Sequence, residues 1–299
     1  MVFGLSSALS FAYLPFVKLA GMPLIAYRAL PKAIIKGLQK NLGVKMKIET
    51  FSNVEKGEQR LDALLDEGKV VGAQTSVFWL PYLPDEMRFH FNGHNLLVYG
   101  REDDTYKISD PVFEEVVVAE KRDFAKARFA KGVMAPKGAL YYPTYVPKTV
   151  DYEKVVPKAV KAVAKTMLKT PVPIAGLKGI RYLAKNIRRL ENKDRRYARL
   201  FLGHIVRMQE EIGTGGAGFR YIYASFLQES GQILENKELL EASEMMTAVG
   251  DSWREFALMI AKSIRKKKNE PIDFDAIAKK LESIADEEAV IYKKLLAAF

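Results

Sequence analysis

The sequence predicts an α+β protein whose first half mixes strands and helices and whose second half is helical. In residues 1–147, segments with strand-like alternation are interleaved with segments of helical periodicity. From Tyr152 onward nearly every segment has helical periodicity, and prolines at positions 143, 147 and 157 surround the change. At 299 residues the chain is long enough for two ordinary domains. We therefore expect a mixed α/β domain over residues 1–147 and an all-α domain over residues 148–299.

Local signals place the helices of the first domain. The apolar stretch Met1–Tyr13 is expected to form a buried helix. Pro31 suits the first turn of a second helix, because its missing N–H has no helical partner there. Ser52 or Asn53 can cap a third helix, which should stop at Gly68.

Two apolar runs around a charged turn predict a β-hairpin. The first run begins at His94, the turn is Arg101–Thr105, and the second run ends at Asp110. Because the start of the first strand lies beside the end of the second, His94 and Asp110 should be direct or diagonal cross-strand neighbours. A carboxylate that orients an imidazole supplies two of the three members of a nucleophilic triad. A purely structural His–Asp pair is the alternative that the pattern leaves open.

The composition restricts what could complete this pair. The chain contains no cysteine, so its residues include no disulfide, no thiolate metal ligand and no thiol nucleophile. With three histidines and no metal-ligand spacing, we expect neither a metal nor a cofactor. Ser6, Ser7 and Ser10 are the serines that could replace the thiol, but no base adjoins them in the sequence.

The apolar N-terminus does not predict a membrane segment. Met1–Tyr27 carries one charged residue and has no basic region ahead of it, which argues against a signal peptide. Pro15, Gly21 and Pro23 divide it into pieces too short to cross a bilayer. The sequence opens inside a hydrophobic run without a capping residue, as a fold entered part-way through would. The absence of cysteine fits a reducing compartment, and we expect a cytoplasmic protein.

Several polar and glycine residues are candidates for substrate binding. A glycine-rich segment, residues 213–218, lies between two predicted helices. It could present N–H groups to an anion, or it could be a tight helix crossing where only glycine fits. The loop Trp79–Phe91 adjoins the His94 strand and could either wall a pocket or simply cover the hairpin. The candidate binding residues are His90, Asn92, Gly213, Gly215, Gly216 and Arg220.

The positive charge of the chain is concentrated in one segment. The formal net charge is +11, and residues 151–210 carry 15 basic and 5 acidic side chains. An apolar stripe runs along the predicted helix from Leu177 to Leu190, with the basic residues of Lys178–Arg189 at other positions. This basic helix is either a solvated face or a surface for an acidic partner. We expect neither a nucleic acid nor a membrane as the partner.

The chain resembles the family of butirosin biosynthesis protein H. The residues that carry the resemblance are the Phe-Gly-Leu-Ser-Ser stretch at 3–7, the segment 89–100 around His94, Ile108-Ser109-Asp110-Pro111, and the glycine-rich segment 211–223. The resemblance covers essentially the whole chain. It implies a papain-like domain, similar to the C39 peptidases that cut leader peptides at double-glycine sites, followed by a helical domain.

The resemblance also implies a reaction. The butirosin protein moves an aminoacyl group from an acyl carrier protein thioester to an amine, and the related peptidases use Cys, His and Asp in that order. His94 then corresponds to the general base and Asp110 to its orienting carboxylate. The nucleophilic cysteine belongs on a helix that precedes the Phe-Gly-Leu-Ser-Ser stretch. We expect that the chain either lacks that helix as a fragment, which we favour, or is a degenerate relative without catalysis.

The same resemblance gives the basic helix a partner. Acyl carrier proteins are acidic, and the helix Lys178–Arg189 could dock one by charge. The acceptor would be a small amine or a peptide. A cysteine peptidase on the same framework and a noncatalytic binding module are the alternative functions, and the oligomeric state stays open.

Overall fold

The chain forms two compact units in a computed structural model that describes residues 1–19, 21–211, 214–265 and 270–299. The helical unit contains Met1–Lys18, Met22–Leu42 and Lys148–Phe299. The α/β unit contains Leu19–Gly21 and Gly43–Pro147. A unit that combines an antiparallel sheet with helices and a second, mainly helical unit confirm the predicted α+β class. Residues 1–42, which the sequence analysis counted with the mixed domain, group largely with the helices instead.

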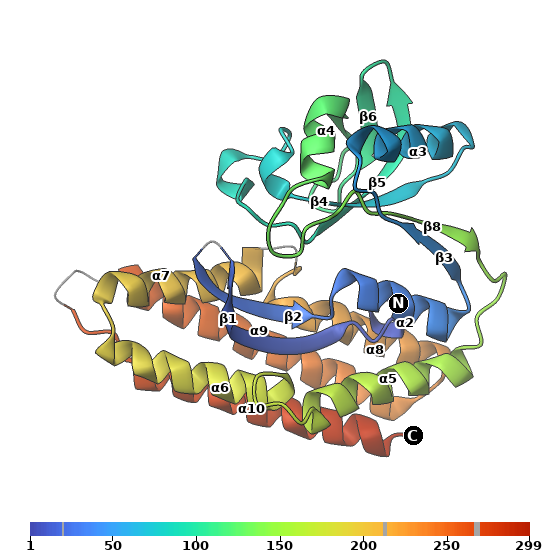
Figure 1. Cartoon of the computed structure of the whole chain (residues 1–299). Coiled ribbons are helices and arrows are strands. Elements are labelled where there is room, and N and C mark those ends of the chain that lie inside the picture. The colour runs from blue at the N-terminus through green and yellow to red at the C-terminus, as the bar shows by residue number, and fades with distance from the viewer. Residues whose placement is uncertain (20, 212–213, 266–269) are drawn as a thin grey trace. The chain divides into compact units, whose positions relative to one another are not determined.

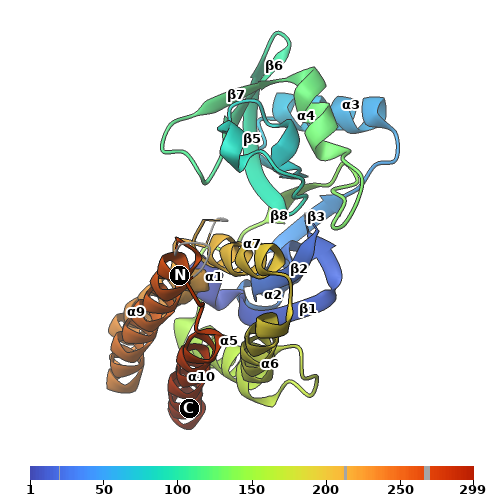
Figure 2. The ribbon, with the colours of Figure 1, turned by 90° about the vertical axis from the view of Figure 1, so that its left-hand side faces the viewer.

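The α/β unit is built on a six-stranded antiparallel sheet with the order β3-β8-β4-β5-β6-β7. Figure 1 labels these strands except β7, which is labelled in Figure 2. The helices α3 and α4 pack against its central strands. Its elements are β3 (Lys45–Glu49), α3 (Val54–Asp66), β4 (Val71–Thr75), the 3₁₀ turns η1 (Val77–Trp79) and η2 (Asp85–Met87), β5 (His94–Glu102), β6 (Thr105–Ser109), β7 (Val117–Glu120), α4 (Lys121–Arg128) and β8 (Leu140–Tyr145).

Alternation along β4 and β5 sends one row of side chains into the core of this unit. Val71 and Ala73 of β4 pair with Val98 and Leu96 of β5, and all four are buried beneath α3 and α4. Because side chains on a strand repeat every two residues, His94 continues this core-facing row at the end of β5. The strand period therefore aims the imidazole to the same side as the hydrophobic core.

The predicted capping and hairpin signals are confirmed. The Asn53 side chain accepts a hydrogen bond from the Lys56 N–H at the start of α3, as expected for an N-cap. β5 and β6 form the expected hairpin, with Leu97 opposite Ser109. One step further along the same register, Asp110 comes opposite Leu96, so it is a diagonal neighbour of His94.

The helical unit is a bundle that also includes a two-stranded ribbon. In it α10 packs against α5, α6 and α9 (Figure 2). The helix α8 packs against α9 as well. Its elements are α1 (Val2–Leu5), β1 (Leu9–Leu19), β2 (Met22–Arg28), α2 (Pro31–Leu42), α5 (Tyr152–Lys169), α6 (Gly176–Arg188), the 3₁₀ turn η3 (Arg189–Asn192), α7 (Arg195–Val206), the π turn η4 (Arg207–Glu211), the 3₁₀ turn η5 (Ala217–Phe219), α8 (Arg220–Ile233), α9 (Lys237–Arg265) and α10 (Phe274–Ala297).

The helix expected over Met1–Tyr13 is wrong beyond its first turn. The helix α1 ends at Leu5, and β1 begins at Leu9. In β1 every second residue, Leu9, Phe11 and Tyr13, is buried, which is the period of a strand. In a continuous apolar run, local periodicity does not distinguish a helix from a strand. Here the packing of alternate residues against the bundle selects the strand.

The predicted stripe of α6 is confirmed. Leu177, Ile180, Leu183 and Ile187 are all buried, and Leu190 follows them in η3. Within the part of the chain that the structure describes, no helix combines the length and the apolar character needed to span a bilayer.

Candidate active site

His94 and Asp110 form a hydrogen-bonded pair within the α/β unit. The His94 Nε2 atom lies 2.7 Å from the Asp110 Oδ2 atom. The Asp110 side chain is fully buried, whereas 12 % of the His94 side chain stays exposed. The pair therefore has a buried carboxylate end and an imidazole end that a reacting group can approach.

Three donors hold the Asp110 carboxylate. Oδ2 accepts from the Tyr82 hydroxyl at 2.9 Å as well as from His94, and Oδ1 accepts from the Val112 N–H at 3.0 Å. Burial raises the pKa of the Asp110 carboxyl, but His94 and the other two donors outweigh it and hold the pKa below its ordinary value. Asp110 is therefore an ionised acceptor at neutral pH.

This arrangement selects one tautomer of His94. An ionised carboxylate can only accept, so the proton between the two residues lies on Nε2 when the ring is neutral. The lone pair is then on Nδ1. An imidazole oriented in this way by a carboxylate is equipped to take a proton from a nucleophile and to return it to a leaving group.

Tyr82 is a member of this cluster that the sequence analysis missed. It lies in the Trp79–Phe91 loop, for which the sequence predicts only a pocket wall or a cover for the hairpin. No spacing or periodicity links Tyr82 to Asp110, 28 positions later. The only sequence feature that points to Tyr82 is that its phenol lies in a loop next to the hairpin.

The other residues of this region hold loops together. The Asn92 amide group donates to the carbonyl oxygens of Lys131 and Val133 at 3.1 and 2.9 Å. His90 is exposed, and its ring stacks on Phe78 with a centroid separation of 4.1 Å. Neither side chain has a recorded contact with the His94–Asp110 pair, and substrate binding by either stays a prediction.

The glycine-rich segment lies in the helical unit, and two of its N–H groups donate to protein acceptors. The Ala217 N–H donates to the Glu210 carboxylate at 3.2 Å, and the Gly216 N–H donates to the Thr214 hydroxyl at 3.1 Å. An anion placed here would meet the negative charge of Glu210. This geometry favours the tight crossing that the sequence left open, and Gly213 lies outside the described residues.

Three positions of this segment favour glycine. Gly215 and Gly216 have φ angles of 66° and 83°, in the left-handed region that favours glycine. A Cβ atom on Gly218 would lie 2.3 Å from the ring of Tyr27, so the chain crosses here at van der Waals contact.

Arg220 is buried in the interior of the bundle. Its guanidinium is fully buried and pairs with Glu288, with distances of 2.9 and 3.2 Å between the donor nitrogens and the two carboxylate oxygens. A third donor reaches the Gly218 carbonyl at 2.8 Å. A role of Arg220 in substrate binding stays a prediction, and its contacts stabilise the fold.

Two of the three candidate serine nucleophiles, Ser6 and Ser7, donate their hydroxyl protons to the backbone. Ser6 donates to the Phe3 carbonyl at 2.7 Å, and Ser7 donates to the Ala159 carbonyl at 3.3 Å. No base is recorded beside either hydroxyl, which agrees with the lack of an activating partner in the sequence.

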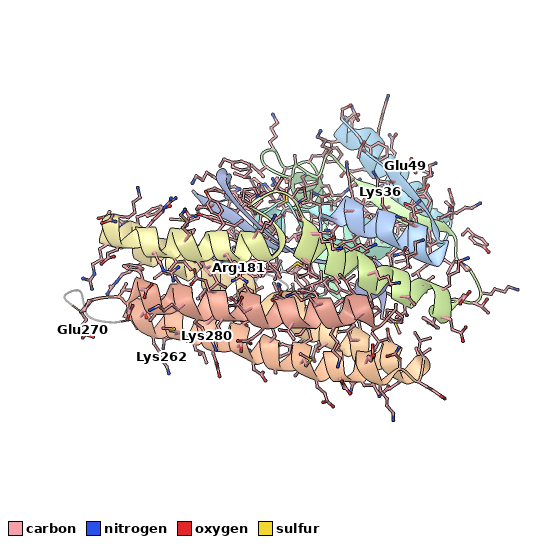
Figure 3. The ribbon with its side chains drawn as sticks, turned by 90° about the horizontal axis from the view of Figure 1, so that it is seen from below. Lys36, Glu49, Arg181, Lys262, Glu270 and Lys280 are labelled. Carbon is pink, nitrogen blue, oxygen red and sulfur yellow. The ribbon has the colours of Figure 1, made fainter. Side chains whose placement is uncertain are left out.

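The basic helix α6 is partly neutralised by its neighbour α10. Arg181 pairs with Asp286 at 2.6 Å, and Figure 3 shows Arg181 on α6 alongside α10. Arg188 pairs with both Asp275 and Glu282. The exposed basic side chains at 178, 181, 185 and 189 follow a spacing of three or four residues, so they form a stripe on one face of the helix.

Comparisons with known proteins match two successive parts of the chain to family models. Residues 1–111 match the family model described as butirosin biosynthesis protein H, N-terminal. Residues 122–295 match the family model of a domain of unknown function, DUF4872. A search of the curated proteins finds no match.

Among solved structures, the chain is similar to one described as a C39-like peptidase from Bacillus anthracis. The identity is 17 %, the TM-score is 0.30, and the match covers 42 % of this chain and 64 % of that one. The family assignment rests on the two family models, which together account for most of the chain. The chain belongs to the family of butirosin biosynthesis protein H.

Proposed function

We propose that this chain carries the His–Asp half of a papain-like thiol acyltransferase that moves an acyl group from a carrier-protein thioester to an amine. The observation that carries the proposal is the 2.7 Å contact between His94 Nε2 and Asp110 Oδ2, which leaves Nδ1 as the free base. Membership of the butirosin protein H family supports the reaction class. The 299 residues contain no cysteine, so the thiol nucleophile is not among them.

In the proposed reaction His94 moves one proton in each half. Nδ1 accepts the proton of the cysteine thiol while the sulfur attacks the thioester carbonyl, and the imidazolium then protonates the departing carrier thiol. In the second half the amine attacks the acyl-cysteine and Nδ1 takes the amine proton. The imidazolium then gives that proton to the departing sulfur, so that the cysteine leaves as a thiol. Asp110 stabilises the imidazolium that forms in both halves. Thioester aminolysis is balanced without a redox cofactor, and a reducing cytoplasm would keep the thiol reactive.

The test begins upstream of Met1 in the gene. If in-frame translation there encodes a cysteine-bearing helix, the extended protein should gain the acyl mass when it is mixed with an acylated carrier. Adding an amine should then release the amide and free enzyme. The 299-residue chain, without a thiol, should gain no acyl mass under the same conditions.

Competing acceptors separate this function from its alternatives. Release of free acid in preference to the amide, together with cleavage of a peptide substrate, would identify a peptidase instead. A stop codon directly upstream, or an acyl adduct on the 299-residue chain itself, would contradict the proposal. A His94→Ala variant of the extended protein should form the adduct at least 100-fold more slowly, since general-base catalysis contributes about 10²- to 10⁴-fold.

We further propose that the carrier docks on the exposed stripe of α6. Carrier proteins are acidic, and the stripe retains exposed Lys178, Lys185 and Arg189, for which no ion pair with the described residues is recorded. Arg188 is unsuitable for a test because reversing its charge would place a carboxylate beside Asp275 and Glu282. Charge complementarity of this kind acts mainly on association and is screened by salt.

The variant Lys178→Glu/Lys185→Glu/Arg189→Glu should weaken carrier binding by about ten-fold or more at low ionic strength. The matched control is Lys154→Glu/Lys158→Glu/Lys165→Glu, which makes the same change in net charge with exposed lysines of α5. Titration calorimetry at two salt concentrations measures both. Equal weakening by the two variants would show an effect of net charge alone and would contradict docking at α6.

A further inference from the structure

Tyr82 reaches the dyad from a loop that is anchored on both sides. Leu80 and Leu83 are buried in the core of the α/β unit, and Tyr82 lies between them. The Tyr82 ring packs edge-on against Phe113, with a centroid separation of 5.7 Å. This packing aims the hydroxyl at Asp110 Oδ2, the same oxygen that accepts from His94.

We propose that Tyr82 is a positioning residue for the His94–Asp110 dyad, holding the carboxylate oxygen at the place where it receives the His94 Nε2 proton. The proposal rests on the proposed function, because positioning matters only if His94 acts as a base. It assigns to the aromatic loop a role in the chemistry rather than in lining a pocket.

The geometry explains why a second donor is needed. The Val112 N–H fixes only Oδ1, and a carboxylate held at one oxygen can still turn about its Cβ–Cγ bond. The Tyr82 hydroxyl fixes the other oxygen at 2.9 Å. With both oxygens held, the direction of the His94 hydrogen bond is determined by groups outside the imidazole.

The phenol is suited to this task because it stays protonated. Burial and the charge of Asp110 both raise the pKa of the Tyr82 hydroxyl, so it is a donor throughout the pH range in which proteins fold. The titratable groups recorded as acting on Asp110 among the described residues are His94 and Tyr82. No lysine or arginine is recorded as sharing the carboxylate, in contrast to the other tyrosine–carboxylate pairs of this unit.

Tyr106 provides a matched control for this arrangement. Its hydroxyl donates to Asp62 at 2.8 Å in the same unit, but Asp62 is also paired with Lys121 and Arg101. Tyr106→Phe removes a comparable hydrogen bond to a carboxylate without touching the dyad. A loss of stability common to both variants can therefore be separated from an effect on His94.

The test is NMR spectroscopy of the native chain, Tyr82→Phe and Tyr106→Phe. In Tyr82→Phe we expect the pKa of the Asp110 carboxyl to rise by about one unit, since a hydrogen bond to a charged group has that effect. We also expect the His94 Nε2–H proton to exchange at least ten-fold faster with solvent. Tyr106→Phe should change neither quantity.

Two results would overturn the proposal. One is a Tyr82→Phe variant that folds with the Asp110 titration and the His94 proton exchange of the native chain. The other result comes from the native chain and applies even if the variant does not fold. Because both protons point at Asp110 Oδ2, the Tyr82 hydroxyl proton should show a cross-peak to the His94 Nε2–H. Absence of a hydrogen-bonded Tyr82 hydroxyl proton in the native chain contradicts the proposal. No acyl donor is used, so this outcome is independent of the acyl-transfer assay.

Discussion

Replacing Glu288 with glutamine is expected to lower the free energy of unfolding of the helical unit by about 3–5 kcal/mol. Glu288 is fully buried and accepts hydrogen bonds from Arg220, the Trp253 indole N–H at 2.7 Å and the Tyr292 hydroxyl at 3.1 Å. Burial lowers the pKa of the Arg220 guanidinium, and the neighbouring Glu288 charge more than restores it. Glutamine keeps the shape but leaves a buried cation without its counter-charge.

The measurement is chemical denaturation followed by tryptophan fluorescence. The chain has two tryptophans, so a Trp79→Phe background leaves Trp253, which contacts Glu288, as the reporter of the helical unit. The double variant Arg220→Met/Glu288→Leu is the control, because apolar replacement of a buried ion pair removes the uncompensated charge. It should recover at least half of the loss. A loss below about 1 kcal/mol in Glu288→Gln would show that the pair contributes no more than an exposed one.

Replacing Asp110 with asparagine is expected to slow acyl transfer by the cysteine-bearing protein by about 10²- to 10⁴-fold. The amide must place its NH₂ group at one of two positions. At the Oδ1 position it would face the Val112 N–H, which can only donate. At the Oδ2 position it faces Tyr82 and His94, both of which can become acceptors.

The NH₂ group of the variant should therefore take the Oδ2 position and donate to His94 Nε2. The ring proton then moves to Nδ1, and the base that the mechanism requires is lost although the fold is kept. Rates of amide formation measure the effect, with Tyr106→Phe again as the control at a remote carboxylate. A rate within three-fold of the native one would contradict the assigned role of Asp110.

The sequence predicted those parts of the site that depend on local pattern. The hairpin register places His94 and Asp110 together because His94 begins β5, Asp110 directly follows β6, and a short turn joins the two strands. The start of α2 at Pro31 and the cap of α3 at Asn53 likewise follow from residues close in the chain. For these features, neighbours in sequence are the interacting partners.

The features that the sequence did not predict depend on contacts between distant segments. Tyr82 meets Asp110 only after the loop folds over the hairpin, and Arg220 meets Glu288 across 68 positions. The strand β1 forms where an apolar run was equally compatible with a helix, and packing of Phe11 against Trp253 accompanies its burial. Periodicity identifies a buried face, but it does not identify what lies opposite that face.

The most direct test of the central claim is the ¹⁵N NMR spectrum of the His94 imidazole in the unmodified chain at neutral to alkaline pH. The chain has three histidines, so His90→Gln and His204→Gln variants assign the signals. The claim that Asp110 prepares His94 as a base predicts a protonated Nε2 and an unprotonated Nδ1, with the pattern reversed in Asp110→Asn. A proton on Nδ1 in the unmodified chain, or an equal mixture of tautomers, would contradict it.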